Sequence, residues 1–392
     1  MKRYPAKDQV AVVGVGSTGF RRDAAGRTSA SLAVEASVAA IRDAGLGRDD
    51  VDALIVAAEP GAPTTHQLAG LLGIPTVLYH GRPSPVAGFA FMDAVNAVYA
   101  GSCDTVLVCF AMMRSPGSSQ SSAKDPFRRH LGHGTPGYPE NANMAAAYAA
   151  WASRYIHEYD ARREDFGLVA INERTNAAQN PLAVMRAPLT MEDYLAARMI
   201  REPLCLFDMD VPVDGADAFV LTSTERARSL GHAPVMIHAA TAGLVGTGDE
   251  DQLPNLRRHG QHVVIERLKQ MSDIWLDDVD VYLPYDGFTN ITLAWIENTG
   301  WCEPGQAGRF LAANWDKERG RVLIDGRIPM NPHGGSLSEG ATRGSGHLRE
   351  AVVQLRGEAG ERQVPGARTA LVTPGGFFFN SQRLILQAAT RG

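Results

Sequence analysis

The sequence has few cysteines and no excess of positive charge. Its four cysteines among 392 residues (Cys103, Cys109, Cys205 and Cys302) lack the short paired spacing of a zinc site or a disulfide framework, which favours a reduced cytoplasmic compartment. Lysine and arginine number 38 against 43 aspartate and glutamate, which gives a net charge of −5. This balance provides no basic surface, so nucleic acid is excluded as the main partner.

Long apolar runs and several common functional motifs are also missing. No stretch approaches the roughly 18 apolar residues of a membrane span, and the polar start of the chain does not resemble a secretory signal. Neither an H-E-x-x-H spacing nor a G-x-S-x-G elbow occurs, so we expect no bound metal and no serine hydrolase. The sequence therefore predicts a soluble cytoplasmic protein.

Strands and helices alternate in the first part of the chain. The helix predicted at Ser29–Ala44 has Thr28 or Ser29 as its cap, and Gly45 ends it. Apolar runs predict strands at 9–15, 52–58, 77–80 and 104–110, with another helix at 88–101. This alternation is typical of an α/β fold whose sheet is buried on both faces.

Between residues 112 and 212 the pattern changes. Residues 114–137 are rich in serine, glycine and charge and read as a loop. Helices are predicted at 144–159, 163–178 and 191–199, before a strand at 216–223. We interpret this region as a mostly helical insertion carried on the first sheet.

The second part of the chain repeats the first. Residues 48–56 (RDDVDALIV) match residues 276–284 (LDDVDVYLP), and each segment leads into a strand. The helix and strand at 88–108 have a counterpart at 343–372. We therefore predict a duplicated α/β unit with halves at 1–230 and 231–392. Turns from both halves would meet in a cleft, which is a favoured place for a ligand.

A glycine pattern near the N-terminus resembles a nucleotide-binding motif. Gly14-Val15-Gly16-Ser17-Thr18-Gly19 spells G-x-G-x-x-G after a strand, but the next helix begins only near Ser29. A dinucleotide-binding helix opens within the glycine turn itself. We interpret the stretch as a structural turn and expect no NAD.

Two segments of the second half concentrate chemically useful groups. Asn331-Pro332-His333-Gly334-Gly335 combines an amide, an imidazole and a glycine pair ahead of a helix, where a negative charge is readily held. Tyr285-Asp286-Gly287-Phe288-Thr289 follows a strand at its carboxyl end, where ligands gather in α/β sheets. His347 lies inside the following helix, and we interpret it as structural.

These segments, with Asp214-Gly215-Ala216-Asp217-Ala218 as a turn before a strand, follow one another in the order of the thiolase superfamily. Over nearly its whole length the chain resembles the lipid-transfer-protein branch, which is related to sterol-carrier-protein thiolases, and within it the steroid side-chain-cleaving aldolases. Gly300–Gly305 and Gln354–Gly357 are similar to that branch. The resemblance implies a five-layered αβαβα thiolase fold.

The resemblance also shows which thiolase groups are missing. The nucleophilic cysteine would fall at Pro85, its activating histidine at Ala341 and the second cysteine near Thr373. The aldolases also lack the cysteine, and Tyr285 matches one of their two tyrosines, whereas Ala341 replaces the other. His333, Arg343, Glu339 or a residue of a partner could supply the lost group.

The resemblance implies a carbon–carbon lyase that cleaves a β-hydroxyacyl-CoA by a retro-aldol reaction, as in steroid degradation and lipid metabolism. We predict Tyr285, His333 and Asp286 as catalytic residues. The predicted substrate contacts are Asn331, Gly334, Gly335, Gly375, Gly376 and Arg343. Coenzyme A enters as the substrate thioester, and no cofactor is expected to stay bound.

The family also implies a homodimer and a small OB-fold partner of the zinc-ribbon type, in an α2β2 assembly. Two alternatives stay open. One is an acyltransferase with a different nucleophile, such as Ser84. The other is a degenerate thiolase-like protein that binds acyl-CoA or lipid, or that acts as a scaffold.

Overall fold

The computed structural model describes residues 4–24, 26–114, 144–244, 255–256, 260–375 and 380–389. Its first part alternates strands and helices along the chain. These are β1 (Val10–Arg21), α1 (Ser29–Asp43), β2 (Ala53–Val56), α2 (Thr65–Leu72), β3 (Tyr79–His80), α3 (Ala87–Tyr99) and β4 (Thr105–Met113). Thr28 is the cap of α1, and its hydroxyl accepts the Ser31 N–H at 3.1 Å. The alternation predicted from the sequence is thus confirmed.

A helical segment and then the second part of the chain follow. The segment contains α5 (Met144–Tyr159), α6 (Arg163–Ala177), α7 (Met191–Ala196), β5 (Met199–Arg201) and β6 (Leu204–Cys205), before β7 (Asp214–Ser223) and α8 (Thr224–Ala227). The second part comprises β8 (Val235–Leu244), α9 (Gly260–Met271), β9 (Val281–Leu283), α10 (Thr289–Thr299), α11 (Ala307–Ala313), β10 (Trp315–Asp316), β11 (Arg321–Ile324), β12 (Ile328–Pro329), α12 (Ser345–Arg356), β13 (Thr369–Val372) and β14 (Asn380–Ala388).

Nine strands form one mixed sheet in the order β3-β2-β4-β7-β1-β8-β14-β13-β9. Strands of the first part occupy one side of this order and strands of the second part the other. The two sides join where β1 pairs antiparallel with β8, through Ala11 opposite Met236 and Val12 opposite Val235. Outward from this seam, β2 pairs parallel with β4, and β9 pairs parallel with β13.

The predicted internal repeat has a matching hydrogen-bond pattern in the two parts. The Asp52 carboxylate, just before β2, accepts the backbone N–H groups of Asp104 and Thr105 at 2.9 and 2.8 Å. The Asp280 carboxylate, just before β9, accepts those of Arg368 and Thr369 at 2.8 and 3.0 Å. Each aspartate thereby ties the start of one strand to the start of its parallel neighbour. The exact division of the chain near residue 230 stays a prediction.

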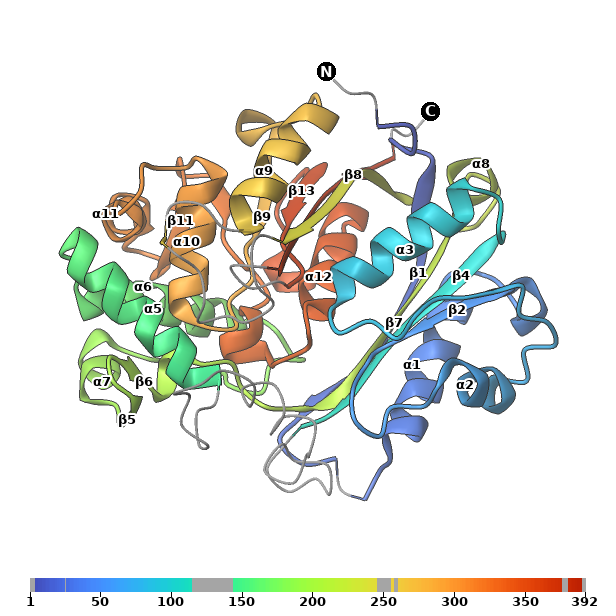
Figure 1. Cartoon of the computed structure of the whole chain (residues 1–392), viewed down its shortest axis with the longest axis horizontal. Coiled ribbons are helices and arrows are strands. Elements are labelled where there is room, and N and C mark those ends of the chain that lie inside the picture. The colour runs from blue at the N-terminus through green and yellow to red at the C-terminus, as the bar shows by residue number, and fades with distance from the viewer. Residues whose placement is uncertain are drawn as a thin grey trace.

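Three buried clusters show that the sheet and helices form five layers. Helix α1 packs on one face of the first-part strands, and α3 and α12 pack between the first-part and second-part strands. Helices α9 and α10 cover the outer face of the second-part strands. Figure 1 shows α3 and α12 at the centre, with α1 and α9 on opposite outer sides. The predicted αβαβα fold is confirmed.

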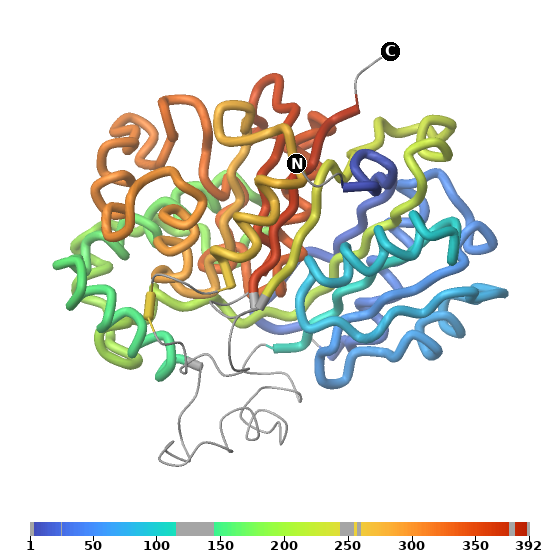
Figure 2. The backbone as a smooth tube through the Cα atoms, turned by 45° about the horizontal axis from the view of Figure 1, so that its top comes forward, coloured from blue at the N-terminus to red at the C-terminus, as the bar shows by residue number. Residues whose placement is uncertain are grey.

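The helical insertion packs on the second part of the chain, although it belongs to the first part by sequence. Helix α6 contacts α10, α11 and β11, and apolar side chains of α5 and α6 share one cluster with those of α10 and β9. Figure 2 shows these segments beside one another, in green and orange. The prediction that the first sheet carries this insertion is therefore wrong, because its apolar faces bury against α10 and α11.

The G-x-G-x-x-G stretch is not a turn. Gly14 and Gly16 lie inside β1, which pairs with β7 through a shifted register. A Cβ atom at Gly16 would lie 2.2 Å from the carbonyl oxygen of Ala36, and one at Gly14 would lie 2.2 Å from that of Ala40. The glycines let α1 approach β1 closely, so their role is packing. Asp214–Ala218, also predicted as a turn, belongs to β7.

This packing predicts that Gly16→Ala destabilises the fold. The added methyl group must push α1 away from β1, and such overpacking costs about 1–3 kcal/mol of unfolding free energy. Gly70→Ala in α2 is the control, because a Cβ there meets nothing within 4 Å and alanine favours the helix. Urea denaturation would contradict the packing role if the two variants were equally stable.

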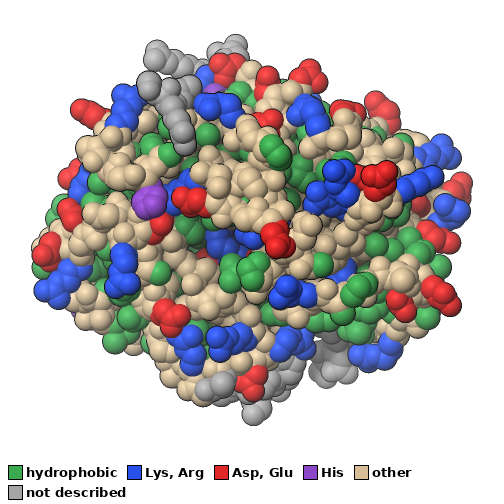
Figure 3. Space-filling view, turned by 180° about the vertical axis from the view of Figure 1, so that it is seen from behind, with side chains coloured by type: hydrophobic (Ala, Val, Ile, Leu, Met, Phe, Trp, Pro, Cys, Tyr) green, Lys and Arg blue, Asp and Glu red, His purple; other side chains and the backbone are tan. Residues whose placement is uncertain are grey.

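On the face seen in Figure 3, acidic and basic side chains are interspersed, so this face has no large area of a single charge. Within the part of the chain that the structure describes, no helix is long and apolar enough to cross a membrane.

Candidate active site

Four segments from distant parts of the sequence meet at the start of α3. The Ala87 N–H, in the first turn of α3, donates to the Arg343 carbonyl at 3.0 Å. A Cβ atom at Gly344 would lie 1.0 Å from the Pro374 carbonyl oxygen, and one at Gly375 would lie 3.0 Å from Val86. The Tyr285 N–H donates to Thr373 Oγ1 at 2.7 Å. These contacts bring the loop after β9, the segment before α12 and the loop after β13 to one place.

Tyr285 is buried where the chain leaves β9, and only 3% of its surface is exposed. Burial raises the pKa of its phenol, and the negative charge of Asp210 raises it further. The positive charges of Arg343 and Arg114 oppose this shift. The phenol is therefore protonated near neutral pH, and two cations lie close enough to stabilise negative charge beside it.

Arg343 is held by a carboxylate that the sequence analysis did not single out. Its Nε donates to Glu59 Oε1 at 2.6 Å, and Arg114 Nε lies 3.7 Å from Glu59 Oε2. Arg343 also has φ +56°, a conformation that non-glycine residues adopt only at a cost of about 1–3 kcal/mol. The signal that could have revealed Glu59 is its place just beyond the carboxyl end of β2.

The carboxylate of Asp286 fills the glycine turn from within. Its two oxygens accept the N–H groups of Ser336 and Leu337 at 2.7 and 3.0 Å, and Oδ1 lies 3.1 Å from His347 Nε2. A Cβ atom at Gly335 would lie 2.0 Å from Asp286 Oδ2. Because Gly335 has no side chain, the Asp286 carboxylate can lie against the turn. The turn itself is a short π-helix at Gly335–Glu339, whose free N–H groups favour a negative charge. Asp286 fixes the turn to the Tyr285 loop.

His333 lies in the wall behind this turn. It is fully buried, and its ring packs edge-on against that of His347 with centroids 4.8 Å apart. Neither ring nitrogen has a hydrogen-bond partner among the described residues. Burial, followed by the influence of His347, lowers the pKa of His333 well below its usual value. His333 is therefore a neutral imidazole near neutral pH.

Asn331 faces another buried carboxyl group. Its Nδ2 donates to Glu173 Oε1 at 3.0 Å and to the Pro284 carbonyl at 2.8 Å. Burial and the charge of Asp286 raise the pKa of Glu173 well above its usual value. Asn331 thereby joins α6 to the end of β9. The sequence analysis missed Glu173 because only tertiary packing brings α6 to this site.

The structure brings most predicted site residues together, and their functional roles stay predictions. Tyr285, Asp286 and His333 surround His347, which was interpreted as structural and contacts all three. Asn331, Gly334, Gly335, Arg343 and Gly375 belong to the same converging segments, whereas Gly376 lies outside the described residues. Among the described residues, no group of three or more histidine, cysteine or acidic side chains is arranged to hold a metal ion.

At or beside the positions that match the thiolase nucleophile, its activating histidine and the second cysteine, the polar groups form hydrogen bonds within the fold. Thr373 Oγ1 accepts the Tyr285 N–H and donates to the Leu283 carbonyl. The Ala341 N–H donates to the Val211 carbonyl at 2.8 Å. Beside Pro85, the Ser84 hydroxyl donates to the Val86 carbonyl at 2.7 Å. The ionisable groups that stand nearby include the Tyr285 phenol, the guanidinium groups of Arg343 and Arg114, and the buried imidazoles of His333 and His347.

Comparison with known proteins agrees with this geometry. A family model described as thiolase C-terminal domain-like matches residues 252–388. The chain is 33% identical to the steroid side-chain-cleaving aldolase of Thermomonospora curvata, over 96% of this chain and 97% of that protein. It is 34% identical to the 17-hydroxy-3-oxo-4-pregnene-20-carboxyl-CoA lyase of Mycobacterium tuberculosis, over 94% and 96% of the two chains.

A solved structure described as an Ltp2-ChsH2(DUF35) aldolase superposes with a TM-score of 0.82 at 32% identity, over 98% of this chain and 99% of that one. The five layers and the converging glycine turns define a protein of the thiolase fold. Within that class, the chain belongs to the branch of the thiolase superfamily that contains the steroid side-chain-cleaving aldolases.

Proposed function

We propose that this protein is a carbon–carbon lyase that cleaves a β-hydroxyacyl-CoA by a retro-aldol reaction. A base removes the proton of the β-hydroxyl group, and the electrons of that O–H bond form a carbonyl. The bond between Cα and Cβ breaks, and its electron pair passes to the thioester as an enolate. A proton returned to Cα completes an acyl-CoA and a ketone or aldehyde. The relatives named as aldolase and lyase support this reaction class.

The proposal rests mainly on one observation, the protonated phenol of Tyr285 in the loop after β9. Tyr285 is buried beside Arg343, while Pro85 and Ala341 stand where a thiolase would hold its nucleophile and activating base. A buried phenol near a cation can donate a hydrogen bond or a proton to a developing enolate. Such a reaction needs no covalent intermediate and no bound cofactor.

The remaining residue roles extend the proposal. Arg343 stabilises the negative charge of the enolate, and His333 takes the second proton-transfer role as a neutral base. Asp286 orients the glycine turn through its contacts with Ser336 and Leu337. Asn331, Gly334, Gly335 and Gly375 shape the wall against which the thioester lies.

We also propose that the chain acts as a homodimer with a small OB-fold partner of the zinc-ribbon type, in an α2β2 assembly. The support is the similar solved structure, whose description pairs an aldolase with a DUF35 protein. The substrate is a coenzyme A thioester, as the name of the M. tuberculosis relative states for that protein. Reduced cytoplasm is the proposed compartment.

A cleavage assay over a panel of β-hydroxyacyl-CoAs, with and without the partner protein, tests the proposal. We expect a ketone or aldehyde and an acyl-CoA in equal amounts, with more activity when the partner is present. A covalent acyl adduct on Ser84 would instead identify an acyltransferase. Tight acyl-CoA binding without any product would identify a degenerate, binding-only protein.

A further inference from the structure

Glu59, just beyond the carboxyl end of β2, lies behind two positively charged side chains. Its Oε1 accepts Arg343 Nε at 2.6 Å, and Arg114 Nε lies 3.7 Å from its Oε2. The Glu59 side chain is 5% exposed, against 20% for Arg343 and 17% for Arg114. A ligand that enters from solvent therefore meets the two guanidinium groups before it meets the carboxylate that holds them.

The backbone of Arg343 is fixed, but its side chain needs a further anchor. The Arg343 carbonyl accepts the Ala87 N–H at 3.0 Å, and φ of Arg343 is +56°. These constraints set the place of the Cα atom and leave the rotatable bonds of a long side chain undetermined. A charge-assisted hydrogen bond is about twice as strong as a neutral one, so the bond to Glu59 offsets the entropy lost when this side chain is ordered.

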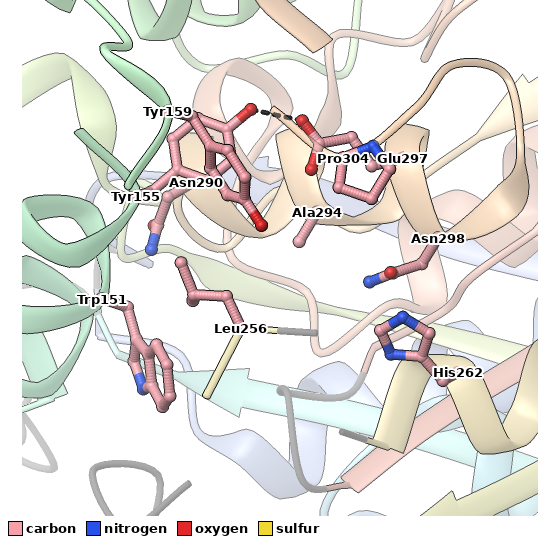
Figure 4. Close-up of a pocket in the computed structure, with 10 residues that line it drawn as sticks. All are labelled: Trp151, Tyr155, Tyr159, Leu256, His262, Asn290, Ala294, Glu297, Asn298 and Pro304. Carbon is pink, nitrogen blue, oxygen red and sulfur yellow. Dashed lines mark hydrogen bonds between the residues drawn. The ribbon is translucent and has the colours of Figure 1, made fainter. Parts of the chain in front are cut away.

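The positive charge near Tyr285 comes from these arginines and not from the cavity shown in Figure 4. That cavity, of about 340 Å³, lies among α5, α9 and α10, and none of the described residues that line it is lysine or arginine. The charges of Arg343 and Arg114, in contrast, both act on the Tyr285 phenol. An anion formed beside this phenol is therefore stabilised by the two side chains that Glu59 holds.

We propose that Glu59 is a positioning residue for the enolate that forms beside Tyr285. It does not touch the substrate, but it fixes Arg343, and with it Arg114, at the place where negative charge develops. A group that stabilises charge acts fully only when it is preorganised, and a displacement of about 1 Å can lower a rate about a hundredfold. This inference rests on the proposed function and adds the residue that orients its electrostatic stabiliser.

Two conservative substitutions separate the position of the Glu59 carboxylate from its charge. Glu59→Asp keeps the charge but withdraws the carboxylate by about 1.5 Å, the length of one carbon–carbon bond. It should lower kcat for thioester cleavage about tenfold or more and leave KM nearly unchanged. Glu59→Gln keeps the length and an acceptor for Arg343 Nε, so its kcat should stay within about threefold of the wild type.

Asp43→Ala is the matched control for loss of a contact between a carboxylate and an arginine. Asp43 Oδ2 accepts Arg356 Nη1 at 2.7 Å, at the end of α12 that lies farther from Arg343 in the chain. This variant should lose stability and keep the wild-type kcat. A Glu59→Gln variant as slow as Glu59→Asp would show that the charge itself acts, and it would overturn the positioning role. Wild-type kcat in both variants would overturn it as well.

Acetoacetyl-CoA tests the same role without cleavage, because its enolate absorbs in the near ultraviolet. When bound to the wild type, it should be half enolate at a pH about one unit or more below that of the free thioester. Glu59→Asp should lose most of this shift. That loss, in a protein that cleaves no thioester, would keep the positioning role and sink the lyase. An undiminished shift in Glu59→Asp would sink the positioning role alone, and if the wild type neither shifts the enolate nor cleaves a thioester, both fail.

Discussion

Tyr285→Phe is expected to lower kcat for thioester cleavage by about 10²- to 10⁴-fold, the usual contribution of a positioned acid or base. The change removes one hydroxyl group from a side chain that is otherwise fixed. The Tyr285 N–H stays bound to Thr373, and the ring keeps its place beside His347. KM should change little, because the lost interaction forms with the enolate and not with the bound thioester.

The physical reason lies in the protonation state of this phenol. Because burial raises its pKa, Tyr285 begins the reaction as a donor. In the proposed reaction, cleavage creates an enolate, and its negative charge would be stabilised by Arg343 and Tyr285. Phenylalanine keeps the shape but has no proton to donate.

Tyr282→Phe is the control for loss of a buried hydroxyl group. Tyr282 lies in β9, and its hydroxyl is 3.2 Å from Thr299 Oγ1, on the side of α10. This variant should lose stability and keep kcat close to that of the wild type. If Tyr285→Phe also keeps full kcat while circular dichroism shows a folded protein, Tyr285 is not the acid and the mechanism fails.

The sequence predicted best those elements whose formation depends on residues close together in the chain. Helix α1 has a capping threonine and a regular apolar stripe, and the aspartate-led segments before β2 and β9 repeat almost letter for letter. The same local evidence misled at Gly14 and Gly16. A glycine that admits a neighbouring helix looks identical in sequence to one that makes a turn, and only the position of α1 distinguishes them.

The site was predicted in outline, and its supporting contacts were not. Tyr285 and the glycine pair follow from motif order, but Glu59 and Glu173 reach the site from elements far away in the chain. His347 follows the glycine turn closely in sequence, and its contact with Asp286 was not predicted. The turn was expected to hold an external negative charge, and the structure shows Asp286 bound to two of its N–H groups. Pairings of this kind depend on the tertiary fold, which periodicity and spacing do not encode.

Arg349→Leu is expected to cost about 3–5 kcal/mol of unfolding free energy, because it strands two buried carboxylates. Arg349 is 3% exposed on α12, and its guanidinium pairs with Asp217 of β7 and with Glu339. Glu339 ends the π-helix of the glycine turn and also accepts Asn180 Nδ2 at 2.7 Å. This one arginine therefore ties the site turn to the central helix and to the first-part strands.

Arg319→Leu is the matched control, because its pair with Asp316 lies at the surface with 60% of the arginine side chain exposed. Surface pairs contribute about 0–1 kcal/mol, so urea denaturation should separate the two variants clearly. Adding Asp217→Asn and Glu339→Gln to Arg349→Leu removes the stranded charges and should restore much of the lost stability. If the single change costs no more than Arg319→Leu, the buried network does not hold the turn, and the hydrogen bonds from Ser336 and Leu337 to Asp286 must suffice.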